Sequence, residues 1–167
     1  MKRIALQIDR ITQALGKLCG WAILLMVVIT ATVALLRYFF GIGWIWLQES
    51  VTYLHSLFFL GTVSYGLLKE GHVRVDIFYR TATQKTQAKV DLLGSLFLLM
   101  PFCLLILTQS FGYVVSSWSI VEGSRETGGI PATFLLKSLI LLFATNLFLQ
   151  AVSQSIKASL TLSQRPL

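Results

Sequence analysis

Four long apolar stretches, separated by short polar connections, constrain the fold of this chain more than any other feature of its sequence. A helix needs roughly 20 apolar residues to cross the hydrocarbon core of a bilayer. Only 13% of the residues are charged, about half the fraction of a typical soluble domain. The sequence therefore predicts one all-α integral membrane domain, residues 1–167, with four transmembrane helices. The predicted spans are residues 18–40, 46–68, 90–118 and 134–152.

The third apolar stretch, residues 90–118, is longer than a bilayer requires. As a helix it would extend about 43 Å, whereas the hydrocarbon core is about 30 Å thick. We therefore expect this helix to tilt, to bend at Pro101 or to project from the membrane. A bend that neighbouring helices satisfy is sufficient to explain Pro101, so we assign the proline no mechanism.

Basic residues lie mostly on one side of the predicted spans. The two terminal segments and the connection between the second and third spans hold 11 of the 14 Lys and Arg residues. The other side has only Arg37, Arg125 and Lys137. By the positive-inside rule, both termini are expected in the cytoplasm. This distribution accounts for the net charge of +7, so no nucleic-acid partner is expected.

The N-terminal segment, residues 1–17, has the period of an amphipathic helix. Its apolar residues Ile4, Ile8, Ile11 and Leu15 recur at intervals of three and four, and its basic residues occupy other faces. Two interpretations remain open. The segment is either an arm that lies in the cytoplasmic interface against membrane lipids or a partner, or an extension of the first span. Both anchor the N-terminus.

The start of the second span carries polar side chains at a density that hydrocarbon cannot solvate. Glu49 lies three residues past Trp46, an expected interface residue, so it is only about 4.5 Å deeper and can stay ionised. We favour structural hydrogen bonds, within the subunit or to a partner, over a direct role of Glu49 in transport. Helical spacing places the polar residues in two adjacent rows. The rows are Glu49, Thr52, Tyr53 and Ser56, and Gln48, Thr52 and His55.

A second polar row runs along the last span toward its C-terminal end. Asn146, Gln150 and Gln154 recur every four residues, which places them on one face of a helix. Hydrogen bonds between membrane helices contribute about 0.6 kcal/mol on average. We therefore interpret this row as a helix-packing contact.

The connection after the second span holds an ordered polar motif of Gly71, His72, Arg74 and Asp76. We expect a structural turn in which ion pairs and hydrogen bonds order the chain and Gly71 supplies backbone freedom. The alternative is a metal site at His72 and Asp76, which we disfavour because no other histidine or cysteine lies nearby.

The connection between the third and fourth spans is short, charged and rich in turn-forming residues. Glu122, Arg125 and Glu126 are its charged members. Two interpretations remain open, a solvated connector and a docking surface for a soluble protein.

The sequence shows no sign of catalysis or of a cofactor. It contains no nucleophile elbow, phosphate-binding loop or metal-ligand spacing. Cys19 and Cys103 lie in apolar stretches and form no C-x-x-C pair, so we expect them to be packing residues. The chain is therefore not expected to be an enzyme.

The chain by itself also lacks the features of a complete transporter. A substrate path usually requires internal repeats, broken helices and a polar site at the membrane midplane. A small multidrug antiporter is the alternative to test, because such proteins have four spans and an essential glutamate midway along the first helix. Here the first span contains no acid, and Glu49 lies near the outer end of the second span.

Motifs spread along nearly the whole chain match one known family. The matching residues are Trp46, Gln48, Glu49, Tyr53, Gly61, the segment 71–76 and the segment 128–131. On these residues the chain resembles the DctQ-type small membrane subunit of tripartite ATP-independent periplasmic (TRAP) transporters. Many members of that family have a second acid where this chain has Gln48, which leaves Glu49 as the better candidate for a functional carboxylate.

The resemblance implies a four-helix subunit of the bacterial inner membrane that is docked on a much larger membrane subunit. The larger subunit is implied to move substrate and sodium by an elevator-like mechanism, with this chain as part of the stationary scaffold. A periplasmic substrate-binding protein is the third implied partner. A closer likeness rests on Gln48 and Glu49 with the segments 53–55, 72–79 and 122–124. These residues resemble a subgroup associated with 2-oxo acids and related organic acids, which implies organic acid anions as substrates. The binding protein and the large subunit are implied to select the substrate.

Overall fold

The computed structural model describes residues 2–71, 79 and 82–163. Its elements, all helical, are α1 (Lys2–Phe40), α2 (Ile45–Leu68), α4 (Gln84–Gly94), a π-helical turn η1 (Ser95–Leu99), α5 (Met100–Ser119) and α6 (Thr133–Ser163). Within the described ranges, four continuous helices are long and apolar enough to cross a membrane. The predicted all-α fold with four such helices is confirmed, whereas the side on which the termini lie stays a prediction.

The N-terminal segment is not a separate helix. α1 continues without a break for 39 residues, a length of about 58 Å that exceeds the hydrocarbon core. The apolar row of its first half faces partly outward: Ile4 is 52% and Ile11 54% exposed, whereas Ile8 and Leu15 are half-buried. Small and polar residues form the face that packs on the rest of the chain. Its buried members are Ala5, Thr12, Gly16, Cys19 and Ala22.

α1 and α2 approach each other closely at two glycines, one on each helix. A side chain at Gly16 would overlap Tyr65, and a side chain at Gly61 would overlap the sulfur of Cys19. Small residues at such positions allow membrane helices to pack backbone to backbone. Cys19 is a buried free thiol that fills the space over Gly61, which agrees with the packing role predicted for it.

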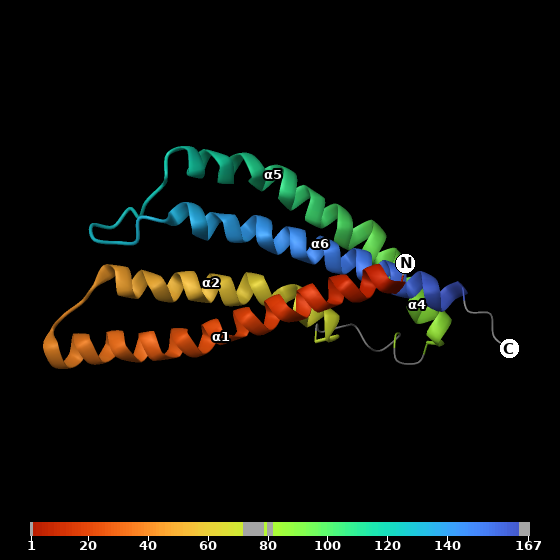
Figure 1. The fold of residues 1–167 in the computed structure, drawn as a ribbon, viewed down its shortest axis with the longest axis horizontal. Helices are drawn as coiled ribbons and strands as arrows, with labels where there is room; N and C mark the ends of the chain where they lie inside the picture. Colours follow the sequence, from red (N-terminus) through yellow and green to blue (C-terminus); the bar gives the residue numbers. More distant parts are fainter. Residues whose placement is uncertain (1, 72–78, 80–81, 164–167) are drawn as a thin grey trace.

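The third membrane helix joins α4, η1 and α5 into one continuous element with an irregular turn. The N–H of Met100 donates to the carbonyl of Ser95, which is the spacing of a π-helix. Pro101 follows directly. A proline ring clashes with the carbonyl four residues earlier, so the wider turn before Pro101 accommodates it. Figure 1 shows the helix curving from α5 into α4.

The long helices lie side by side in a thin layer. α1 packs along α2, α2 packs on α6, and α6 packs on α5, in the order that Figure 1 shows at the end where the α1–α2 and α5–α6 connections lie. We call this the loop end. At the other end, which we call the terminal end, α1 also packs on α6. α6 is the central helix, because it packs on α1, α2, α4 and α5.

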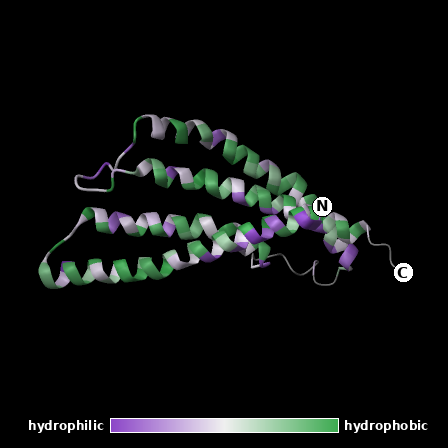
Figure 2. Cartoon of the chain, in the orientation of Figure 1, coloured by the Kyte–Doolittle hydropathy of each residue, from purple (hydrophilic) through white to green (hydrophobic). Residues whose placement is uncertain are grey.

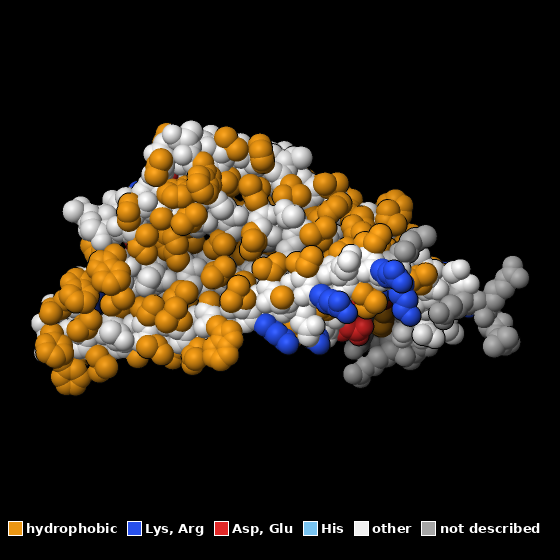
Figure 3. All heavy atoms as spheres, in the orientation of Figure 1, with side chains coloured by type: hydrophobic (Ala, Val, Ile, Leu, Met, Phe, Trp, Pro, Cys, Tyr) orange, Lys and Arg blue, Asp and Glu red, His pale blue; other side chains and the backbone are white. Residues whose placement is uncertain are grey.

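The outer surface of the layer is apolar over most of its length. Figure 2 shows hydrophobic residues along the middle of every long helix. Figure 3 shows apolar side chains covering this face of the molecule toward the loop end, with the Lys and Arg side chains gathered near the terminal end. A helix surface of this composition is suited to hydrocarbon or to another membrane protein.

Candidate functional site

Glu49 of α2 contacts the connection between α5 and α6, residues 120–132. Its Oε2 accepts a hydrogen bond of 2.6 Å from the backbone N–H of Ile130, and its Oε1 accepts one from the hydroxyl of Ser124. Hydrogen bonds to an ionised carboxylate are roughly twice as strong as neutral ones. The contact therefore holds the α5–α6 connection against α2, and it is a structural contact within the subunit.

Two consecutive glycines allow the connection to reach Glu49. Gly128 has a φ of 82°, a left-handed conformation that favours glycine. A Cβ at Gly129 would lie 2.7 Å from Oε1 of Glu49 and would overlap the Ser124 side chain. Each residue of the Gly-Gly-Ile segment therefore has a defined role. The first glycine turns the chain, the second leaves room for the side chains of Glu49 and Ser124, and Ile130 donates its N–H.

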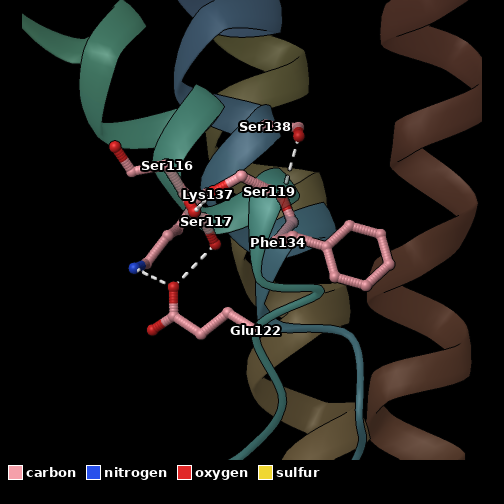
Figure 4. A network of polar contacts seen from close by, with 7 residues as sticks. All are labelled: Ser116, Ser117, Ser119, Glu122, Phe134, Lys137 and Ser138. Atoms are coloured by element: carbon pink, nitrogen blue, oxygen red, sulfur yellow. Dashed lines mark hydrogen bonds and ion pairs between the residues drawn. The ribbon is translucent and has the colours of Figure 1, made fainter.

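A second group of contacts fixes the start of the same connection, as Figure 4 shows. The hydroxyl of Ser117 on α5 donates to Oε2 of Glu122 at 2.7 Å, and the ammonium of Lys137 on α6 forms an ion pair with the same oxygen at 2.5 Å. The Lys137 Nζ also lies 4.0 Å from the centroid of the Tyr113 ring, within the range of a cation–π interaction. Glu122 therefore joins α5 to α6.

The backbone before Glu122 is strained. Val121 has a φ of 46°, which is unusual for a β-branched residue. The N–H of Glu122 donates to the carbonyl of Ser117 and that of Val121 to the carbonyl of Trp118, which is the Schellman pattern at the end of a helix. This turn directs Glu122 back toward α5 and α6.

The electrostatics of Glu122 follow from these partners. The hydrogen bond from Lys137, followed by the one from Ser117, holds the pKa of this carboxyl below its ordinary value of 4.5. Glu122 was a candidate for docking a soluble partner, but its carboxylate is half-buried and held by contacts within the chain. These contacts do not test docking, which stays a prediction for Glu122. Arg125 and Glu126 are exposed, and for them docking also stays a prediction.

The polar residues of α2 divide between two surfaces. Glu49, Tyr53 and Ser56 are half-buried, whereas Thr52, which the sequence allowed in both rows, is exposed. The other exposed members of its row are Gln48 and His55. The sequence therefore predicted both rows but not which of them faces the other helices of the chain.

The turn after α2 contains a left-handed residue. Glu70, not Gly71, has the left-handed backbone, with a φ of 56°. The N–H of Gly71 donates to the carbonyl of Gly66 and that of Glu70 to the carbonyl of Leu67, a second Schellman pattern. The left-handed residue of this turn is therefore Glu70, and the role of Gly71 in the segment that follows stays a prediction. The other residues of the motif lie outside the described residues: His72, Arg74 and Asp76.

The sequence predicted only part of a third polar cluster, which lies at the terminal end. The carboxylate of Asp9 on α1 accepts hydrogen bonds from Ser153 at 2.7 Å and from Gln150 at 3.3 Å, both on α6. Lys157 forms an ion pair with it at 2.5 Å. The sequence indicated packing for the row that contains Gln150, but it did not indicate Asp9. The signal was a single acid among the basic residues of the N-terminal segment.

The three clusters provide hydrogen bonds and charge but no reaction centre that we recognise. Over residues 2–71, 79 and 82–163, no three His, Cys, Asp or Glu side chains gather closely enough to hold a metal ion. The Glu49 and Asp9 clusters join elements that lie far apart in the sequence, and the Glu122 cluster joins the consecutive helices α5 and α6. Their arrangement supports a structural role, in which polar contacts fix both ends of the helix layer.

The fold and these clusters define a membrane protein of four long helices whose polar residues fix helix packing and one connecting loop. The family model for the DctQ component of tripartite ATP-independent periplasmic transporters matches residues 25–161. Because the match covers most of the chain, this protein belongs to the DctQ family, a family of transporter components. No curated protein and no solved structure matched the chain.

The family match confirms the resemblance that the sequence motifs indicated. It makes the chain the small membrane component of a TRAP transporter, and therefore a multi-pass protein of the inner membrane whose partners are the other components of that system. The small multidrug antiporter, which was the alternative, gains no support from the comparisons.

Proposed function

We propose that this chain is the stationary scaffold subunit of a sodium-coupled TRAP transporter for organic acid anions. In this proposal, the large membrane subunit carries substrate and sodium in an elevator-like movement, and the small subunit holds it in place. One observation carries the proposal: polar clusters fix the helix layer at both ends. Asp9 ties α1 to α6 at the terminal end, and Glu49 ties α2 to the α5–α6 connection at the loop end.

A scaffold must keep its shape while its partner moves. The helices of this layer bury little of their surface against one another. The polar clusters therefore help to keep the helices in place, because interhelical hydrogen bonds fix the register of the helices. A transport path would instead require polar groups that line a shared cavity near the midplane. Glu49 is committed to Ile130 and Ser124, which supports a structural role over direct participation in transport.

The proposal includes an orientation with both termini in the cytoplasm and the loop end in the periplasm. The Lys and Arg side chains near the terminal end support it (Figure 3), because basic residues are retained on the cytoplasmic side. The exposed residues Arg125 and Glu126 would then face the periplasm. We propose them as contacts for the substrate-binding protein.

The experiment that tests this function is sodium-driven uptake in proteoliposomes that contain the large subunit and the cognate binding protein, with and without this chain. Labelled 2-oxo acids and dicarboxylates serve as substrates. We expect uptake only when the chain is present and a sodium gradient is imposed. Full uptake by the large subunit and binding protein without this chain would contradict the scaffold function.

The Glu49→Ala variant separates the two roles of Glu49 in the same system. A structural role predicts lower recovery of the two-subunit complex, with normal uptake per recovered complex. A direct role in transport predicts full recovery of the complex and lost uptake. Copurification from detergent, measured beside uptake, distinguishes the two outcomes.

A further inference from the structure

The exposed polar row of α2 has no hydrogen-bonding partner among the residues that the structure describes. Gln48 and Thr52 make no side-chain hydrogen bond to any described residue, and His55 only stacks on Phe59, with 6.2 Å between the ring centroids. All three residues are exposed. They lie on the surface of a helix long and apolar enough to cross a membrane, where hydrocarbon cannot satisfy an amide, a hydroxyl or an imidazole.

Two hollows meet at this row. One, of about 330 Å³, lies between α1 and α2 and is bounded by Arg37, Thr30, Gln48 and Thr52 among others. The other, of about 310 Å³, lies between α2 and the α5–α6 connection and is bounded by Gln48, Thr52 and Glu126 among others. The shared residues make the two hollows neighbours. We call the polar surface formed by Arg37, Gln48, Thr52 and His55 the loop-end strip.

The strip carries one charge, that of Arg37. Arg37, three residues before the end of α1, is exposed and forms no ion pair with any residue that the structure describes. Glu126, on the α5–α6 connection, borders the second hollow but lies outside the strip. A complementary surface would therefore present a carboxylate over α1 and hydrogen-bonding groups over α2.

Lipid alone does not complement the strip along its whole length. The stacked rings of Trp44 and Trp46 at the start of α2 are of the residue type that marks the level of the headgroups. A headgroup phosphate at that level can pair with Arg37. However, His55 lies about 10 Å further along the helix axis than Gln48, where a bilayer offers only acyl chains. A protein helix can supply polar groups at both depths.

We propose that the loop-end strip receives a transmembrane helix of the large TRAP subunit, which places a carboxylate against Arg37 and hydrogen-bonding side chains against Gln48 and Thr52. This inference rests on the proposed scaffold function and specifies its interface. The matching large subunit is thus recognised by polar complementarity across α1 and α2.

The test is photo-crosslinking in membranes that contain the complete transporter. A benzophenone amino acid replaces Ile45, which borders the second hollow and leaves every residue of the strip intact. Phe111 on α5, which is 61% exposed, is the matched control position. We expect the probe at position 45 to form a crosslink to the large subunit, in a peptide from a transmembrane helix that contains Asp or Glu. Crosslinks from position 45 to lipid alone would overturn the proposal.

Two variants test the chemistry of the strip. Arg37→Glu should lower recovery of the large subunit at least fivefold, and reversal of the crosslinked acid to Arg should restore it. Gln48→Leu should lower recovery more than Gln109→Leu, because Gln109 is an exposed glutamine on α5 outside the strip. The opposite ranking would place the interface on α5 and overturn the inference. If the unaltered chain retained no large subunit, the scaffold function itself would fail, so the two failures are distinguishable.

Discussion

The backbone N–H of Ile130 lies 2.6 Å from Oε2 of Glu49, although the two residues are 81 positions apart in the sequence. Through this hydrogen bond, the second membrane helix holds the segment that leads into the fourth. Glu122 makes a comparable connection between α5 and α6 through Ser117 and Lys137. Two carboxylates therefore determine the geometry of the loop end.

Replacement of Glu49 by alanine should destabilise the purified chain in detergent. The N–H of Ile130 and the hydroxyl of Ser124 would both lose their acceptor, at a cost of about 1–3 kcal/mol. Glu49→Gln retains one acceptor oxygen, so its effect should be smaller. Thermal unfolding measures both variants, with Glu126→Ala as the control on an exposed carboxylate. Equal melting temperatures for all three variants would contradict the assigned role.

Close packing of α1 on α2 predicts a large difference between two glycines. Gly61→Ala places a methyl group against the sulfur of Cys19, and such overpacking costs about 1–3 kcal/mol. Gly20→Ala is the matched control, because a methyl group there meets nothing within 4 Å. We expect a clear loss of thermal stability for the first variant and none for the second. A stable Gly61→Ala variant would show that the two helices do not pack in this register.

Relief of backbone strain at Val121 should stabilise the protein. A left-handed conformation costs an L-residue about 1–2 kcal/mol, and glycine avoids that cost while losing more entropy on folding. Val121 is 67% exposed, so its removal sacrifices little packing. Val121→Gly should therefore gain about 0.5–1 kcal/mol, whereas Val115→Gly, within α5, should lose stability. Denaturation by heat in detergent compares them, and a loss at both positions would refute the strain.

The lowered pKa of Glu122 predicts an acid-sensitive contribution to stability. Because its pKa is lower in the folded chain than its ordinary value of 4.5, the contribution is complete above pH 4.5. It disappears as the pH falls through the lower value of the folded state. The stability difference between the unaltered chain and Glu122→Gln should accordingly shrink below pH 4.5. Glu126→Gln, which alters the same charge on the same connection, serves as the control. A difference that is constant from pH 7 to pH 3 would be the contrary result.

Charge reversal at Arg125 and Glu126 should weaken productive docking of the binding protein more than assembly in the membrane. Both side chains are exposed, so the double variant Arg125→Glu with Glu126→Arg leaves the contacts of Glu49 and Glu122 in place. We expect reduced uptake when binding protein is limiting and normal recovery of the membrane complex. Unchanged uptake at limiting binding protein would exclude these residues as docking contacts.

Length and hydropathy were sufficient to predict the four membrane helices, because a bilayer imposes one strong requirement on every span. Tertiary contacts were harder to predict from the sequence. The polar spacing of α2 gave two rows, but the choice between Glu49 facing inward and Gln48 facing outward depends on a loop more than 70 residues away. The residue pattern of α2 alone therefore does not indicate this contact.

Two backbone features were also not predicted, because they depart from the usual preference of residue types for backbone conformations. The left-handed positions that end α2 and α5 are Glu70 and Val121, where the preferred residue is glycine. Asp9 was overlooked for a different reason. Its partners Ser153 and Lys157 lie at the far end of the chain. The interpretation of the N-terminal segment was based instead on its apolar residues, of which Ile4 and Ile11 face outward.

Affinity purification of this chain from its native membranes in mild detergent, followed by mass spectrometry of the intact assembly, tests the central claim most directly. The account predicts recovery together with one large multispan membrane subunit in a fixed ratio. Recovery only as a homodimer that binds lipophilic cations would contradict it and would favour a small multidrug antiporter.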